Sequence, residues 1–343
     1  MANANAAARA VILDRYRSAA PAEIGGPSVF QGWPGLVLLG QCIERELGRP
    51  VPSVTELALR WRHAEATLPR IPPRYASSFV YGERGLTWAE DTLAGRATGS
   101  LRPPPAPVGF DTFANDAPVF FAACRRREPS TLAAWAEFTA REVQTLDRMT
   151  ASGRPVPLGF AHGVAGLLFR ALRLAGLHPA FERDALVARF DWLANWRHED
   201  EQGARWPAKT DEAPADSWVV HSLCNGSLGH ALVFVEAGVR LEHERFIHIA
   251  QQALRTTRDE SETNGGFCCG QAGRAAIVSR FLRLGVRPRS TEAIGCLQRL
   301  QARIPRVAHE HTLRPISGLA SCLPALYAEA PDSPILDFFL PEP

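Results

Sequence analysis

The chain has 343 residues, 46% of them hydrophobic, and its 38 basic and 36 acidic residues leave a net charge of only +2. This length suffices to bury a large core in one closed domain or in two ordinary ones, and the balanced charge excludes a nucleic-acid partner. The first twenty residues carry charges within their apolar part and no run of about 18 apolar residues occurs, so we predict neither a secretory signal nor a membrane span, and a cytoplasmic location.

A Gly-x-x-Gly motif recurs along the chain, and each copy leads into an apolar run with helical spacing. In chain order the copies start at Gly32, Gly82, Gly163, Gly226, Gly270 and, in a degenerate form, Gly318. A seventh copy, FDTFANDAP, has Asn115 and Pro118 at the glycine positions. Successive starts are 50, 33, 48, 63, 44 and 48 residues apart. The pattern predicts seven inner helices, with apolar runs such as 167–176, 231–238 and 275–285.

Amphipathic segments lie between the copies and predict a second set of helices. They include residues 53–68, where Ser53 and Glu56 form a capping box, and residues 130–146 and 181–196. Signals for β-strands are weak, and the Pro- and Gly-rich residues 97–109 and 200–216 are predicted loops.

The alternation of apolar and amphipathic helices predicts an all-α fold. We expect an α/α toroid, a seven-fold double-layer α-barrel whose inner helices all begin at the same end. An open solenoid of stacked helix pairs is the alternative, although its repeat length usually varies less. We expect one domain over residues 1–343, with residues 1–20 as an N-terminal helix or extension.

The seven cysteines are an odd number in a chain predicted to be cytoplasmic, which argues against a disulfide framework and for metal binding or catalysis by some of them. Four lie alone in apolar segments and are interpreted as small buried hydrophobic residues: Cys42, Cys124, Cys296 and Cys322.

The other three cysteines occupy equivalent places in the repeats, together with a histidine. The residues one or two positions before the first glycine include His162, Cys224, Cys268 and Cys269, in three consecutive repeats. Thiolates favour zinc, and three protein ligands leave the fourth tetrahedral position open, as in catalytic zinc sites. We therefore predict a zinc ion held by the three cysteines at the mouth of the toroid. The alternative is that these small residues only allow a tight helix entry.

The motifs GFAHGVAG, LCNGSLG and FCCGQAG, with SGLA and the ending LDFFLPEP, resemble those of the lanthionine synthetase C-like family over nearly the whole chain. The resemblance implies a seven-fold α/α barrel with zinc at its mouth and a dehydrated precursor peptide as partner. In the implied reaction a zinc-bound cysteine thiolate of that peptide adds to dehydroalanine or dehydrobutyrine and closes a thioether ring. The chain has no room for a dehydratase domain, so a separate dehydratase is implied as well.

The resemblance also implies roles for single residues. Cys224 and Cys268 match two zinc ligands, while Cys269 stands where most members have histidine, as in the cyclase portions of certain two-domain lanthipeptide synthetases. His162 matches a histidine that transfers a proton, a task suited to an imidazole pKa near 6.5. Asp111 matches an acidic residue expected near that histidine, and its alternative role is a helix cap.

The chain departs from the family pattern just before the first zinc cysteine. Members commonly have Arg-Asp-x-Trp there, whereas this chain has Val-His-Ser-Leu at residues 220–223. An arginine that could stabilise an enolate oxygen is therefore missing at its usual place. His221, Arg84 and Arg274 are the candidates to replace it. Two functions remain: a zinc-dependent peptide cyclase, and a non-catalytic scaffold that binds a peptide, a small thiol or a partner enzyme.

Overall fold

The computed structural model of the chain describes residues 10–15, 17–18, 33–47, 56, 58–60, 62, 83–94, 101–104, 112–213, 222–256 and 270–288. The chain forms two compact units that interleave in the sequence. Unit 1 comprises Met1–Ser100, Glu262–Ser279 and Gly295–Glu342, and unit 2 comprises Leu101–Ser261, Arg280–Ile294 and Pro343. The single domain expected for residues 1–343 stays a prediction.

The described part of unit 1 is helical. Helices α3 (Trp33–Leu47) and α5 (Glu83–Leu93) pack against each other, and α12 (Gln271–Arg283) begins in this unit and ends in unit 2. Residues 10–15 and 17–18 are helical too. None of the described helices is long and apolar enough to cross a bilayer.

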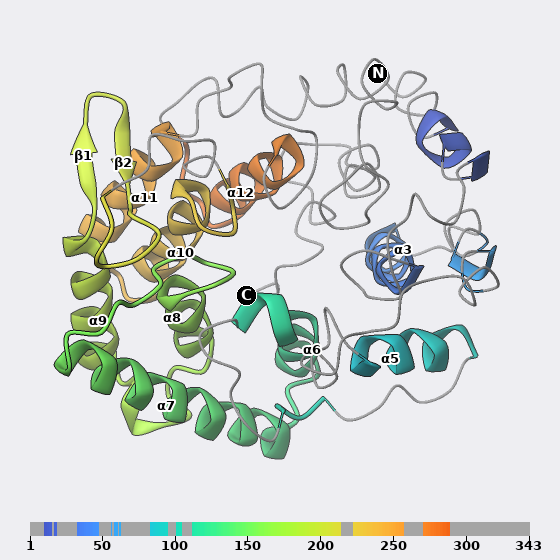
Figure 1. The fold of residues 1–343 in the computed structure, drawn as a ribbon, viewed down its shortest axis with the longest axis horizontal. Coiled ribbons are helices and arrows are strands. Elements are labelled where there is room, and N and C mark those ends of the chain that lie inside the picture. Colours follow the sequence, from blue (N-terminus) through green and yellow to red (C-terminus); the bar gives the residue numbers. More distant parts are fainter. Residues whose placement is uncertain are drawn as a thin grey trace. The chain divides into compact units, whose positions relative to one another are not determined.

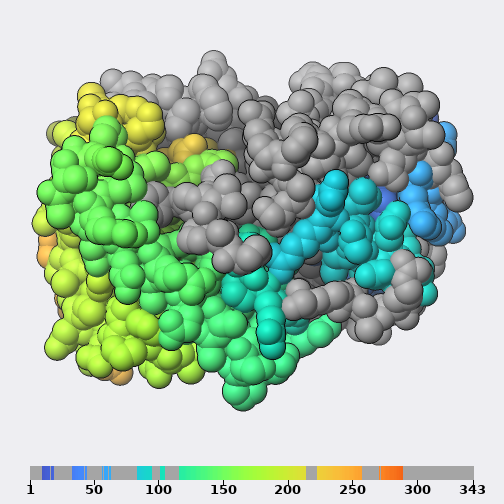
Figure 2. Space-filling model, turned by 60° about the horizontal axis from the view of Figure 1, so that its bottom comes forward, coloured from blue at the N-terminus to red at the C-terminus, as the bar shows by residue number. Residues whose placement is uncertain are grey.

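Unit 2 holds two kinds of helix, which differ in how much of their surface is buried. Helices α8 and α10 are buried on all sides over nearly their whole length, whereas α7, α9 and α11 bury one face and expose the other. Figure 1 shows α7 and α9 on two sides of α8, and the green surface atoms of Figure 2 include α7. The bounds are α6 (Thr112–Arg126), α7 (Pro129–Ala151), α8 (Val164–Arg173), α9 (Arg183–Asn195), α10 (Ser227–Arg240) and α11 (Glu244–Thr256).

The predicted helix starts agree with the structure wherever the motif keeps its first glycine and is described. Helices α3, α5, α8, α10 and α12 each begin at the residue after that glycine. The start predicted from the degenerate copy is wrong, because α6 begins three residues before Asn115 and has Pro118 inside it. Without a glycine, nothing in this copy interrupts the helical backbone, and Pro118 costs the helix one hydrogen bond. The copy at Gly318 lies outside the described residues.

The second glycine of the motif allows a close approach between two backbone segments. A Cβ atom at Gly166 in α8 would overlap the carbonyl oxygen of Phe160, and one at Gly229 in α10 would overlap that of Leu223. In both repeats the contacted carbonyl belongs to the residue six positions earlier. The motif therefore serves to fold the entry segment tightly onto the first turn of its own inner helix.

Replacing Gly166 by alanine is expected to lower the free energy of unfolding by about 3 kcal/mol, because the Cβ atom would overlap backbone that cannot move independently. Urea unfolding followed by circular dichroism measures the loss. Gly285→Ala is the matched control: its φ of +73° disfavours alanine but no atom lies within 4 Å, so about 1 kcal/mol should be lost. Equal losses in the two variants would contradict the steric role of the motif.

A short hairpin corrects the prediction that residues 200–216 form a loop. Strands β1 (His198–Asp200) and β2 (Gly203–Arg205) pair antiparallel, and the remaining residues up to 213 are irregular. The turn forms because the Asp200 carboxylate accepts a hydrogen bond from the backbone N–H of Gln202 at 2.8 Å and because Gly203 adopts a φ of +132°. In the other predicted loop, residues 101–104 are irregular as expected.

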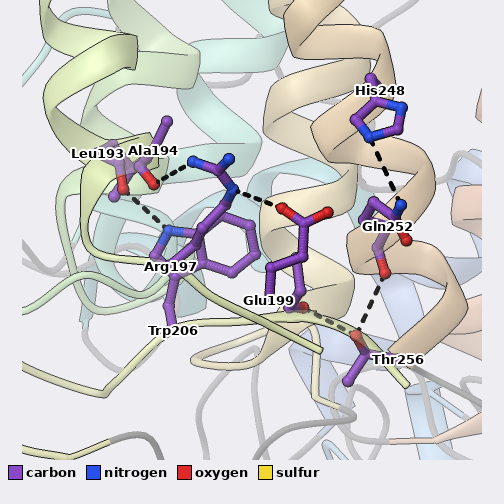
Figure 3. Close-up of polar contacts among 9 residues, drawn as sticks. Leu193, Ala194, Arg197, Glu199, Trp206, His248, Gln252 and Thr256 are labelled. Atoms are coloured by element: carbon purple, nitrogen blue, oxygen red, sulfur yellow. Dashed lines mark hydrogen bonds and ion pairs between the residues drawn. The ribbon is translucent and has the colours of Figure 1, made fainter. Parts of the chain in front are cut away.

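The hairpin and the residues that flank it bind to outer helices on both sides, as Figure 3 shows. On one side the Thr256 hydroxyl of α11 donates to the carbonyl oxygen of Ala204 at 2.9 Å. On the other side the indole N–H of Trp206 donates to the carbonyl oxygen of Leu193, near the end of α9, also at 2.9 Å. The hairpin therefore fixes α9 to α11 and places the Trp206 ring inside unit 2.

A buried ion cluster ties the inner helices together near their C-terminal ends. The carboxylate of Glu236 in α10, which is completely buried, binds Arg173 of α8 at 2.9 Å, Arg280 of α12 at 2.5 Å and Arg240 at 2.9 Å. Burial raises the pKa of the Glu236 carboxyl, but the three guanidinium groups lower it by more, so that it lies below its usual range. Glu236 is therefore ionised at neutral pH and joins three inner helices.

Cys124 of α6 is a free thiol. Burial raises its pKa to about 11, although the nearby charge of Arg173 opposes the shift. The thiol is therefore protonated at neutral pH, in line with its interpretation as a hydrophobic residue rather than a thiolate.

Candidate functional site

Two of the six predicted site residues lie in the described part of the chain, His162 and Cys224, and both belong to unit 2. The other four lie outside the described residues: Cys268, Cys269, Asp111 and His221. Their roles therefore stay predictions. Of the two arginines considered as replacements for the missing one, Arg84 lies in the first turn of α5 and Arg274, which is buried, in the first turn of α12.

Cys224 lies in a tight turn directly before α10. In this turn, residues 222–226, here called the cysteine turn, the backbone N–H of Asn225 donates to the Ser222 hydroxyl at 3.2 Å and that of Gly226 to the Ser222 carbonyl oxygen at 3.1 Å. Gly226 is the N-cap of the helix, and Cys224 is 8% exposed. The turn thus holds the cysteine at the helix entrance, nearly shielded from solvent.

His162 lies in a folded segment directly before α8. In this segment, residues 157–163, here called the histidine loop, the Leu158 N–H donates to the carbonyl oxygen of Ala208 and the Val164 N–H to that of Pro157, both at 2.9 Å. A Cβ atom at Gly163 would lie 2.5 Å from the Gly159 nitrogen, so the loop can fold back on itself only with glycine there. His162 itself is half-buried.

The histidine loop and the cysteine turn lie against each other. The Ala161 N–H donates to the carbonyl oxygen of Cys224 at 2.7 Å, and a Cβ atom at Gly159 would lie 2.8 Å from the same oxygen. His162 is therefore adjacent in sequence to a residue that is hydrogen-bonded to Cys224. The structure thus brings the backbones of two predicted site residues side by side, although they are 62 positions apart in the sequence.

A third group at this junction, His230 of α10, was not predicted from the sequence. Its ring is completely buried, with Nδ1 at 2.9 Å from the carbonyl oxygen of Gly226 and Nε2 at 3.1 Å from that of Leu158. The ring stacks on Trp206 with centroids 4.2 Å apart and planes almost parallel. The only sequence signal was a lone histidine in the apolar run SLGHALVF, which by itself is typical of a core position.

The stability of unit 2 should depend on pH through His230. Burial lowers its pKa to about 4, and the hydrogen bonds to Gly226 and Leu158 oppose this shift only in part. In the unfolded chain its pKa returns to about 6.5, so below that pH the unfolded chain binds a proton that the folded chain does not. The free energy of unfolding should therefore fall as the pH drops from about 6.5 towards 4, by about 2 kcal/mol between pH 7 and 5.

Urea unfolding of the wild type and of His230→Gln at pH 7 and pH 5 measures the contribution of His230 to this pH dependence. The contributions of the other titrating groups cancel when the two proteins are compared. The glutamine variant should lose about 2 kcal/mol less than the wild type over this interval. His198→Gln, at an exposed position of β1, is the matched control for a histidine replacement outside the core. Parallel losses in the wild type and His230→Gln would show that His230 does not titrate as expected.

Cys224 is the one side chain of the cysteine turn that contains sulfur. Cys224 is disulfide-bonded in this structure. In its reduced form Cys224 has the donor type that a zinc ion prefers, a thiolate. Among the described residues alone, no group of three His, Cys, Asp or Glu side chains could hold a metal.

Comparisons with known proteins agree on the family and the fold. The family model described as "Lanthionine synthetase C-like protein" matches residues 133–310. The solved structure of "Nisin cyclase" is similar, with a TM-score of 0.60, 13% sequence identity and coverage of 97% of this chain and 98% of that one. No curated protein matches the sequence. This structural similarity confirms the predicted fold class, an all-α α/α toroid.

Proposed function

Because the chain belongs to the lanthionine synthetase C-like family, we propose that it is a zinc-dependent cyclase of a dehydrated precursor peptide. The proposed reaction forms a thioether between a cysteine of that peptide and its dehydroalanine or dehydrobutyrine. The hydrogen bond from the Ala161 N–H to the Cys224 carbonyl oxygen is the observation that supports the proposal, because it joins the backbone next to His162, the proposed proton carrier, to that of Cys224, the proposed metal ligand.

The metal would be held by Cys224 together with Cys268 and Cys269. Zinc bound there would keep a substrate thiol in its reactive thiolate form near neutral pH. Only the reduced cysteines can serve as ligands, so the disulfide of Cys224 has to be opened first. The backbone of Cys224 is held by its own turn at the start of α10, which supports a role for this cysteine as a preorganised ligand.

The proposed addition needs two proton transfers, and His162 is proposed to carry one of them. The sulfur forms a bond to the β-carbon of the dehydroamino acid, the electron pair of the double bond passes to the α-carbon and its carbonyl group, and a proton then binds the α-carbon. The proton lost from the thiol equals the proton gained by the carbon, so no atom is added or lost overall. His162 would carry one of these two proton transfers, with Asp111 orienting it. His221 is proposed to stabilise the enolate oxygen in place of the missing arginine.

Two measurements on the reduced protein test the proposal. Elemental analysis should find about one zinc per chain. Incubation with a dehydrated peptide should give a product of unchanged mass that no longer reacts with a thiol-alkylating reagent, at a rate above the uncatalysed addition.

The missing arginine before Cys224 supports the alternative of a non-catalytic scaffold of the same fold, which binds a peptide, a small thiol or a partner enzyme. Tight binding of the peptide with its thiol as reactive as in buffer would establish the scaffold and refute the cyclase. Absence of stoichiometric zinc would remove the assignment of the three cysteines.

A further inference from the structure

We propose that His230 is a positioning residue, which keeps the histidine loop and the cysteine turn in register and thereby holds His162 beside Cys224. The link to ring closure rests on the proposed function, whereas the link between the two segments does not. His230 is completely buried, so its role is to hold other groups in place rather than to touch the substrate.

The imidazole ring reaches both segments through its two polar atoms. Nδ1 faces Gly226, the last residue of the cysteine turn, and Nε2 faces Leu158, near the start of the histidine loop. The Leu158 contact joins residues 72 positions apart. Together with the hydrogen bond from Ala161 to Cys224, it gives the two segments two points of attachment.

The two carbonyl oxygens that face the ring differ in how many other hydrogen bonds they accept, and this difference favours the tautomer with the proton on Nε2. Burial lowers the pKa of the ring to about 4, so the neutral imidazole has a single N–H to donate at neutral pH. The Gly226 oxygen already accepts from two backbone N–H groups, those of Gly229 at 3.2 Å and of His230 at 3.4 Å, whereas the Leu158 oxygen accepts from one, that of Ala165 at 3.4 Å. A buried carbonyl without a good donor is costly, so the proton is best placed towards Leu158.

The orientation of the ring is fixed from a second direction. Trp206 covers its face, and the indole is itself held by its hydrogen bond to Leu193 of α9. Figure 3 shows this anchor of Trp206 at the end of the hairpin. The ring cannot tilt without moving the indole, so Nε2 stays directed at the histidine loop.

Loss of the N–H at the Nε2 position should therefore loosen the histidine loop against the cysteine turn. The hydrogen bond from Ala161 to Cys224 would then open more often, and the Ala161 amide proton would exchange faster with solvent. His162, the next residue, would lose its fixed place relative to Cys224. This consequence appears in the exchange rate whether or not the protein is an enzyme.

Three variants of the full-length protein separate positioning from general stability. His230→Gln keeps an amide N–H near the position of Nε2, His230→Asn places its N–H near the position of Nδ1 only, and His230→Phe keeps the flat ring on Trp206 without a donor. Hydrogen exchange at neutral pH should show the Ala161 amide about tenfold faster in the Asn and Phe variants and close to wild type in the Gln variant. Amides inside α9 serve as the reference for unchanged global stability.

An unchanged Ala161 exchange rate in the Asn variant would overturn the proposal, as would equal acceleration in the Gln and Asn variants. The comparison of Gln with Asn suffices if the Phe variant does not fold. Ring-closure kinetics then test the link to function: the Asn variant should lower kcat about tenfold with KM unchanged, and Gln should restore it. If the wild type closes no ring while the exchange pattern holds, the cyclase proposal fails and the positioning role stands.

Discussion

Replacing His162 by alanine is expected to slow ring closure by at least about 10²-fold while zinc remains bound, since a positioned proton-transfer group typically contributes about 10² to 10⁴. The backbone of the histidine loop is held by the hydrogen bonds of the Leu158 and Val164 N–H groups and by the close approach of Gly163 to Gly159. The fold and the cysteine turn should therefore survive the change. The measurement is the single-turnover rate of thiol loss from a dehydrated peptide, with zinc determined on the same sample.

Two other variants serve as controls for the His162→Ala result. Cys224→Ala should remove both zinc and activity, because it deletes a metal ligand rather than a proton carrier. His198→Ala, at an exposed position of β1, should leave both unchanged. If His162→Ala closes rings at the wild-type rate, the proton passes through another group or through water, and the role given to His162 is wrong.

Replacing Glu236 by glutamine should lower the free energy of unfolding by about 3 to 5 kcal/mol, since it removes the carboxylate charge that two buried guanidinium groups bind, those of Arg173 and Arg280. Arg173 and Arg280 approach one carboxylate oxygen and Arg240 the other, so a neutral amide cannot replace these contacts. Urea unfolding followed by circular dichroism measures the loss. Glu199→Gln, which breaks a partly exposed pair with Arg197, should cost at most about 0.5 kcal/mol.

The pH dependence of this cluster has a definite sign. The pKa of Glu236 is lower in the folded than in the unfolded chain, so its stabilising contribution is complete above the unfolded pKa and is lost as the pH falls through the folded one. The difference in stability between wild type and Glu236→Gln should accordingly shrink in acid. A difference below about 1 kcal/mol at pH 7 would show that the cluster is not a main support of the inner helices.

Features with a local cause could be predicted from the sequence. The inner helices begin after the first glycine of each intact motif because the second glycine, as at Gly166 and Gly229, permits contact between the first helical turn and the entry segment. Helices α7 and α9 were predictable from a stripe of apolar residues at helical spacing, which any chain must bury. Alignment of the repeats also placed His162 and Cys224 at equivalent helix entries.

Features that depend on contacts across the fold could not be predicted. The hairpin of β1 and β2 lies in a Pro- and Gly-rich stretch that resembles a loop. Its hydrogen bond to Thr256 and the close approach of Gly203 form only when α11 packs beside it. The early start of α6 could not be predicted either, because a copy of the motif without glycines does not specify where its helix begins.

The sequence by itself therefore determined the all-α class, the alternation of inner and outer helices and the position of the cysteine turn, since glycine geometry and apolar periodicity act within a few residues. Only the tertiary structure decided that His230 joins Gly226 to Leu158 and that Glu236 gathers Arg173 and Arg280. A polar residue in an apolar run must find a partner when it is buried, and the partners Leu158, Arg173 and Arg280 lie 44 to 72 positions away from the residue that they bind. The free energy of burying these groups is set by the packed fold, because only packing removes water and brings the distant partner within hydrogen-bond distance.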